Sequence, residues 1–227
     1  MSVGTLVSSG AGAAATSPKQ TVLNAIAASQ GVSSVHVVGS VTTGSQVVGL
    51  NVYASNANAG QGSITINGAT VKIVRLGARV YFNADTAFWT SQAGASAAGY
   101  ANKWVYTAAT GTDGKSFSQF LGAAALFKQI LSGNKINQSV FVSGANTTVG
   151  GVAVYAINGS DTTDGTSGVI YIARQGKPYL IGLKTTNSSG SGTIAFSGYN
   201  KPVHPKTPPH AISLTQLEQQ ATAPTAA

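Results

Sequence analysis

The chain has 227 residues, which is enough for one sizeable hydrophobic core. Only 8% of the residues are charged, 28 are Gly and none is Cys. This composition argues against a coiled coil or a bundle of charged helices, and it excludes disulfides, thiolate metal sites and cysteine nucleophiles. A hydrophobic fraction of 43% argues against wholesale disorder, and no apolar run reaches the roughly 18 residues of a membrane-spanning helix.

Positive charge is in excess but scattered. Thirteen Lys and Arg residues stand against five Asp and Glu residues, for a formal net charge of +8. The tightest basic grouping is Lys72, Arg75 and Arg79, which is too sparse to follow a phosphate backbone. We therefore expect no nucleic-acid partner, and we expect at most a weak attraction to an anionic envelope or membrane surface.

The first regular element is predicted to be a helix from about Pro18 to Gln30. Ser17 is suited to the N-cap, Pro18 to the first helical position and Gln20 to a capping box, and Gly31 ends the pattern. Residues 1–17 are expected to be a flexible tail or a targeting remnant, with any native anchor lying upstream of Pro18. Residues 18–217 are predicted to form one domain and residues 218–227 a second flexible tail.

From Val35 onward the apolar period changes from that of a helix to two. Strands with alternating apolar residues are separated by turn signals at Gly44-Ser45, Asn67-Gly68 and Gly77, which predicts an antiparallel meander of five strands. A weak helix is expected within residues 92–100 and a further strand at residues 103–106. Further strands are predicted at residues 139–143, 152–157, 169–174, 180–185 and 192–197.

A second helix is predicted from Phe117 to Leu131. Ser116 and Gln119 fit a capping box, a broad apolar face follows, and Gly133 would stop the helix. Because the helices are too few to connect parallel strands, the fold class is α+β, mainly β. It consists of a curved antiparallel sheet of about ten strands, with the N-terminal helix and this second helix packed on one face.

A phosphate-loop pattern occurs at residues 109–116, ATGTDGKS, between a strand and a helix. Asp113 would place a negative charge beside the phosphates, and the neighbouring strands pair as hairpins rather than as a parallel sheet. Nucleotide binding is therefore kept as a distant alternative to a plain turn and helix start.

Other motifs offer little catalytic chemistry. Asp161 and Asp164 resemble half of a calcium loop but lack the further carboxylates that such a loop needs, so they predict a polar turn. His36, His204 and His210 have no acidic neighbour in sequence and are expected to lie on the surface. With only five acidic residues, the chain has few ways to assemble a hydrolase site. We therefore predict that the protein is not an enzyme and that it needs no cofactor.

The sequence nevertheless resembles a known family. Its segments SVHVVGSVTTGSQVVGLNVYAS, GSITINGATVKIVRLGARVYFNADTAFWTSQAG, FSQFLGAAALFKQIL and VIYIARQGKPYLIGL are similar to those of actinobacterial envelope lipoproteins of the LolA-like superfamily, the LppX and LprG group. The resemblance covers roughly residues 18–217. It implies an unclosed half-barrel with helices over its concave face, a hydrophobic cavity for acyl chains, and a role in carrying lipids or lipoglycans. The Cys that would bear a lipid anchor in that family does not occur in this sequence.

The expected cavity and the alternation of the strands together give a set of candidate lipid-binding residues. Alternation places one apolar row of the meander on a single face, opposite the second helix. The predicted lining is Val37, Val41, Val48, Leu50, Val52, Ile64, Ile66, Val71, Ile73, Phe120 and Leu121. Small residues at Gly39, Gly49, Ala54 and 123–125 are taken to leave room for a ligand, although close helix-to-sheet packing would use the same residues.

The expected partners are lipid or lipoglycan acyl chains, and the expected location is extracytoplasmic, in the cell envelope or secreted. The protein is expected to be a monomer. A structural or adhesive envelope protein with the same sheet and a fully packed core is the alternative that the pattern leaves open.

Overall fold

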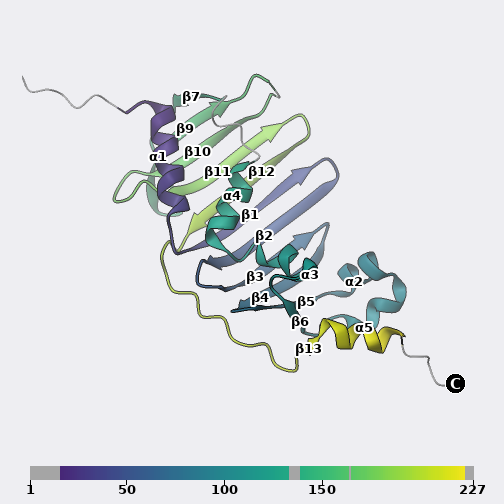
Figure 1. The fold of residues 1–227 in the computed structure, drawn as a ribbon. Helices are drawn as coiled ribbons and strands as arrows, with labels where there is room; N and C mark the ends of the chain where they lie inside the picture. The colour runs from purple at the N-terminus through teal and green to yellow at the C-terminus, as the bar shows by residue number, and fades with distance from the viewer. Residues whose placement is uncertain (1–15, 133–138, 164, 223–227) are drawn as a thin grey trace, which may run out of the picture.

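A computed structural model describes residues 16–132, 139–163 and 165–222, so residues 1–15 and 223–227 of the two expected tails lie outside the described residues. Its centre is one curved, open sheet (Figure 1). The strands are β1 (Ser34–Thr43), β2 (Gln46–Ser55), β3 (Ala59–Ile66), β4 (Ala69–Leu76), β5 (Arg79–Ala84), β6 (Val105–Ala108), β7 (Val140–Ser143), β8 (Thr147–Val149), β9 (Val152–Ser160), β10 (Ser167–Ala173), β11 (Leu180–Asn187), β12 (Gly190–Ser197) and β13 (Ile212–Ser213).

The strand order is β13-β6-β5-β4-β3-β2-β1-β12-β11-β10-β9-β7, with β8 also paired to β9. All pairs are antiparallel except the two-residue contact of β13 with β6. The central seam joins β1 to β12, so the five-strand meander and the C-terminal strands form one continuous surface. The mainly antiparallel sheet is confirmed, with 13 strands in the described chain rather than about ten.

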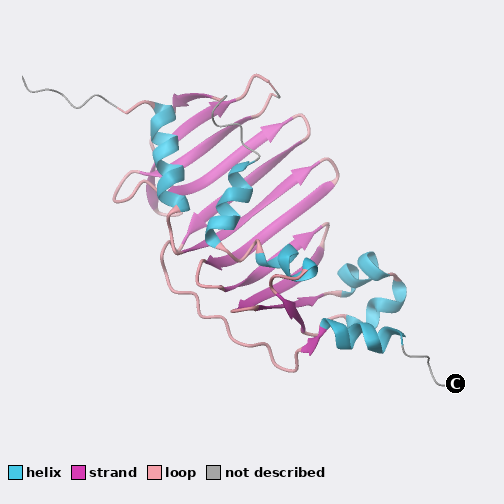
Figure 2. Cartoon of the chain, viewed as in Figure 1, coloured by secondary structure: helices cyan, strands magenta, loops and turns pink. Residues whose placement is uncertain are grey.

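Five α-helices accompany the sheet in the described ranges: α1 (Pro18–Gln30), α2 (Thr86–Ala93), α3 (Thr112–Ser118), α4 (Ala123–Ser132) and α5 (Leu214–Thr222). A 3₁₀ helix, Ala95–Tyr100, follows α2. Figure 2 shows α1, α4 and α3 crossing one face of the sheet, while α2 and α5 lie beyond its lower end. None of the helices in the described segments is both long and apolar enough to cross a membrane.

The N-terminal helix has the predicted bounds. The Ser17 hydroxyl accepts a hydrogen bond from the Gln20 backbone N–H at 3.2 Å, and Gly31 ends the helix. Gln20 forms only half of the predicted capping box, because its amide donates to Asn24 rather than back to the cap.

The predicted helix from Phe117 to Leu131 is wrong as one element, because the chain turns between α3 and α4. Ser116 lies inside α3 and donates to the Thr112 carbonyl, so it is not a cap. The carbonyl of Leu121 accepts the backbone N–H of Ser55 at 2.9 Å, which removes it from any helical ladder. The expected stop at Gly133 lies outside the described residues.

Several further elements were not predicted or were misplaced. The weak helix expected within residues 92–100 is instead α2 followed by the 3₁₀ turn, and the two short strands β8 and β13 carry too little pattern to be recognised. Helix α5 runs across the expected domain end at Leu217, so regular structure continues to Thr222.

Tyr199 links the end of the sheet to α1. Its hydroxyl donates to the Leu180 carbonyl, and the Leu180 N–H donates to the buried Ser29 hydroxyl of α1 at 2.9 Å. Burial raises the pKa of the Tyr199 phenol far above its usual value, a hydrogen bond with Ser29 opposes this shift, and the nearby Tyr179 adds to it.

We expect Tyr199→Phe to lower the free energy of unfolding by about 1 kcal/mol at neutral pH, through loss of one hydrogen bond. The folded pKa is raised, so the stability held by the neutral phenol is complete below about pH 10 and is lost as the pH rises further. The wild type should therefore lose more stability than the variant in alkaline urea titrations. An identical loss in both proteins would contradict the burial of this phenol.

Candidate functional site: a cavity on the concave face

The concave face of the sheet is packed at one end and hollow at the other. Along β1 the exposed fraction rises from 1% at Val37 to 38% at Val41. Strand β2 runs in the opposite direction, so exposure decreases along it. Val48 and Leu50 are half-buried, and Val52 is fully buried. Both strands therefore run from a closed core into an open space near the turn that joins them.

The packed end is where the helical layer is attached. Gly60 of β3 lies so close to Leu121 that a Cβ atom there would stand 2.9 Å from the Leu121 side chain and carbonyl oxygen. The Asn56 side chain accepts the Ala124 N–H at 3.0 Å at the start of α4, and it donates to the Val32 carbonyl. Phe127 of α4 is fully buried and stacks on Phe196 of β12 with ring centroids 5.3 Å apart.

At the open end the structure contains a cavity of about 710 Å³. Its floor is the concave face of β1–β4, β11 and β12, and its opposite wall comes from α2, α3, α4 and the turn between α3 and α4. The apolar lining is Val41, Val48, Leu50, Ile64, Ile66, Val71, Phe88, Phe117, Phe120, Leu126, Ile130, Leu183 and Ile194. This volume falls within the range of roughly 300–1,000 Å³ that is typical of small-molecule sites.

The rim of the cavity is polar but carries no charge in the described part of the chain. It is formed by Thr42, Thr43, Ser116, Gln129, Thr166, Thr185, Thr186, Asn187, Ser189 and Ser191. The β1–β2 and β11–β12 turns are joined by a 2.7 Å hydrogen bond from the Gly44 N–H to the Ser189 carbonyl. Figure 1 shows both turns at the right edge of the sheet, beyond α1 and α4.

The sequence-predicted lining residues divide between these two ends. Seven of them line the cavity: Val41, Val48, Leu50, Ile64, Ile66, Val71 and Phe120. Four lie in the packed core and do not line it: Val37, Val52, Ile73 and Leu121. Alternation identified the correct face of each strand, but it carries no information on where along that face the helical layer ends.

The small residues have a different role from the one predicted. A Cβ atom on Gly39 would lie 2.3 Å from the Thr193 carbonyl oxygen, so this glycine permits close strand contact. Gly49 lies opposite Thr65 in the β2–β3 ladder, while Ala54 and Ala123 are fully buried. None of the described small residues named for this purpose lines the cavity. Close packing fits the buried Ala54 and Ala123, whereas Ala124 and Ala125 are exposed.

Several lining residues were missed. Phe88 is positioned by Asp85, whose two carboxylate oxygens accept the Phe88 N–H at 2.8 Å and the Thr70 N–H at 2.6 Å. An Asp followed by an aromatic pair was a usable signal, since Asp is a common N-cap. Leu183 and Ile194 could not be assigned, because their position depends on the long-range pairing of β1 with β12.

Gly114 of the phosphate-loop pattern is buried, and a Cβ atom there would lie 2.0 Å from the Ala108 carbonyl oxygen, so close backbone packing explains this glycine. His36 lies on the convex face and stacks on Tyr53 with centroids 3.9 Å apart. No cluster of three or more metal-ligating side chains occurs in the segments described, and Asp164 lies outside them.

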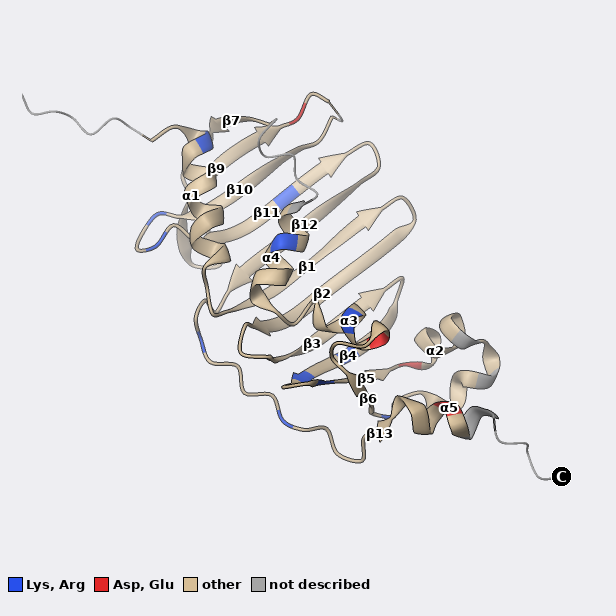
Figure 3. Ribbon diagram, viewed as in Figure 1, with Lys and Arg blue, Asp and Glu red and all other residues tan. Residues whose placement is uncertain are grey.

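Basic residues do not gather at the cavity. Figure 3 shows Lys and Arg dispersed over the sheet, the helices and the extended segment that leads to β13. The arrangement agrees with the scattered charge of the sequence and leaves the site apolar with a neutral rim.

Comparison with known proteins supports the fold. No protein-family model matches the sequence, and no curated protein matches it significantly. Among solved structures, the chain is similar to the lipoprotein LppX of Mycobacterium tuberculosis, with 16% identity and a TM-score of 0.53, over 82% of this chain and 96% of that one. It is also similar to LprF of Mycobacterium bovis, with 14% identity and a TM-score of 0.54, over 84% and 96%. The predicted curved antiparallel half-barrel, an open α+β fold, is therefore confirmed.

Two tryptophan substitutions on one face of β2 test where the cavity begins. Val48→Trp adds bulk beside open space and should change the melting temperature little. Val52→Trp adds the same bulk to a closed core and should destabilise the fold by about 1–3 kcal/mol or more. Thermal and urea unfolding of both variants measures the difference, and equal destabilisation would mean that the space beside Val48 is filled.

Asn56→Ala tests how the helical layer is held. It removes the side-chain acceptor for the Ala124 N–H in the first turn of α4, and loss of one such hydrogen bond costs about 1 kcal/mol. Hydrogen exchange should increase in α4 while the β1–β12 seam keeps its protection. The exposed Asn146→Ala serves as a matched control, and a uniform loss of protection in Asn56→Ala would contradict a local attachment.

Proposed function

We propose that this protein binds lipids without catalysis, holding acyl chains in the cavity at the open end of the concave face. The observation that carries the proposal is the 710 Å³ space between the apolar concave face of the sheet and its helices. A domain whose only task was structural would gain stability from filling this space, because side chains facing a void lose contacts.

The cavity chemistry suits hydrocarbon. Its floor and wall are aliphatic and aromatic side chains, and its described lining holds no Lys, Arg, Asp or Glu. Transfer of each methylene group out of water contributes about 0.8 kcal/mol, so a long chain supplies a large gross driving force. Part of this is offset by the loss of translational and rotational freedom on binding.

The proposed location is extracytoplasmic, in the cell envelope or secreted. The support is the fold shared with LppX, which is a lipoprotein, together with the fit of the cavity to apolar chains. In this location the protein would carry lipids or lipoglycans across the envelope in its apolar cavity. We propose that it does so as a monomer, with at most weak attraction to an anionic membrane surface. Scattered basic residues are compatible with such an attraction.

The test uses two adjacent residues that face opposite sides of β2. Protein is purified from an envelope fraction, and its bound lipids are extracted and measured by mass spectrometry. We expect wild type to retain lipid, Val48→Trp to lose most of it, and Val47→Trp, which adds the same bulk at a site 44% exposed and absent from the cavity lining, to behave as wild type.

Two outcomes would contradict the proposal. Wild-type protein that carries no lipid and takes up none from lipid vesicles would favour a structural or adhesive envelope domain. Equal loss of lipid in Val47→Trp and Val48→Trp would show that the lipid is not held on the concave face.

A further inference from the structure

A second, smaller pocket lies between α1, α4 and strands β7 to β12. It has a volume of about 50 Å³ and its walls are mainly apolar, with Ile26 from α1, Leu131 from α4 and Phe141 from β7 among them. Thr166, Leu183 and Thr185 line both this pocket and the large cavity, so the two spaces adjoin. The small pocket can hold a group of a few atoms but not a chain.

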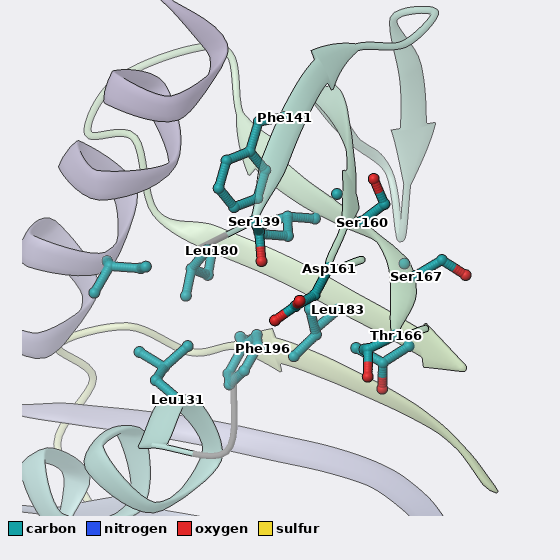
Figure 4. A pocket seen from close by; sticks show the side chains of 15 residues that line it. Leu131, Ser139, Phe141, Ser160, Asp161, Thr166, Ser167, Leu180, Leu183 and Phe196 are labelled. Carbon is teal, nitrogen blue, oxygen red and sulfur yellow. The ribbon is translucent and has the colours of Figure 1, made fainter. Parts of the chain in front are cut away.

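A buried carboxylate faces this pocket. Asp161 is 5% exposed and follows β9 at the turn into β10, where its N–H donates to the Thr166 carbonyl at 2.8 Å. Its Oδ1 accepts the Thr163 N–H at 2.7 Å, whereas its Oδ2 is buried and has no hydrogen-bond partner. Figure 4 shows the Asp161 side chain in the middle of the lining residues, close to Leu183.

The free oxygen is an unusual feature. Buried polar atoms in proteins are nearly always hydrogen-bonded, because a charged group without partners is costly to remove from water. Asp161 has no ion-pair partner in the described segments, and no cluster of metal-ligating residues includes it there. A donor that enters the pocket would satisfy this oxygen, and the large cavity supplies the adjoining space for the rest of such a ligand.

We propose that the Asp161 carboxylate accepts a hydrogen bond from a free hydroxyl at the polar end of an uncharged lipid whose chains occupy the large cavity. This inference rests on the proposed function and adds the class of head group. A phosphate or carboxylate head group would be repelled by Asp161 and would find no cation in the described lining of either space. Of the labelled serines, Ser139 points its hydroxyl toward the middle of the pocket (Figure 4), which suits a neutral polar group.

A hydroxyl fits this oxygen better than an ammonium group. A hydroxyl brings one donor, which matches one vacant acceptor. An ammonium group brings three donors and a full charge into a small, mostly apolar space, where its other two donors would have to be removed from water as well.

The test pairs a ligand change with a protein change. 1,2-Dioleoylglycerol and 1,2-dioleoyl-1,2-propanediol differ only by the terminal hydroxyl, and each is offered in trace amount from phosphatidylcholine vesicles to the full chain. Asp161→Asn should reduce uptake of dioleoylglycerol about tenfold or more, as expected for loss of a hydrogen bond to a charged group, and leave uptake of the deoxy lipid unchanged. Asp113→Asn, the same change at an exposed residue of α3, should affect neither lipid.

A measurement on the wild type keeps the test valid if Asp161→Asn folds poorly. The carboxyl ¹³C resonance of Asp161 should shift when dioleoylglycerol binds and stay unchanged with the deoxy lipid. If Asp161→Asn changes the uptake of both lipids equally, or of neither, the head-group assignment is overturned and the pocket holds water instead. Tighter, Asp161-dependent binding of the corresponding 3-amino lipid would overturn the choice of a hydroxyl. Failure of wild type to take up either lipid would instead count against the proposed function itself.

Discussion

The structure depends on the attachment of a short helical layer to one end of a strongly curved sheet. Leu121 packs directly on Gly60, its carbonyl accepts the Ser55 N–H, and the Asn56 side chain accepts the Ala124 N–H in the first turn of α4. These contacts close the concave face around Val52 and leave it open around Val48. The cavity is therefore a consequence of where the helices are fixed, and the strands that form its floor are the same strands that form the core.

The neutral rim follows from the composition of the chain. With 8% charged residues, the hairpin turns at the open end are made of Thr, Ser, Asn and Gly, whose side chains can bond the backbone locally. Asn187 illustrates this, since its Oδ1 accepts the N–H groups of Ser189 and Gly190 at 2.9 Å. Such turns keep their shape without ion pairs, so the cavity can accept an apolar ligand without burying a charge, and Asp161 stands out by contrast.

Much of the fold could be predicted from local signals. The cap at Ser17 and the period-two runs after Val35 correctly gave α1 and the meander, because caps and alternation are encoded by adjacent residues. The break between α3 and α4 could not be predicted, because it depends on a hydrogen bond from Ser55 to a carbonyl 66 positions later, and the apolar pattern of Phe117 to Leu131 continues across it. For the site, alternation identified the face, and long-range packing decided which of its residues line the cavity. The role of Asp161 had no signal, since a turn aspartate looks the same in sequence whether or not both its oxygens are bonded.

Whether acyl chains occupy one end of the concave face can be measured by intermolecular nuclear Overhauser effects between acyl methylene protons of bound 1,2-dioleoylglycerol and the methyl groups of the protein. We expect contacts with Val41, Val48, Leu50 and Ile66, and none with Val37 or Val52 on the same strands. Contacts confined to Val38 and Val47 on the convex face, or contacts that include Val52 in the closed core, would contradict binding in this cavity.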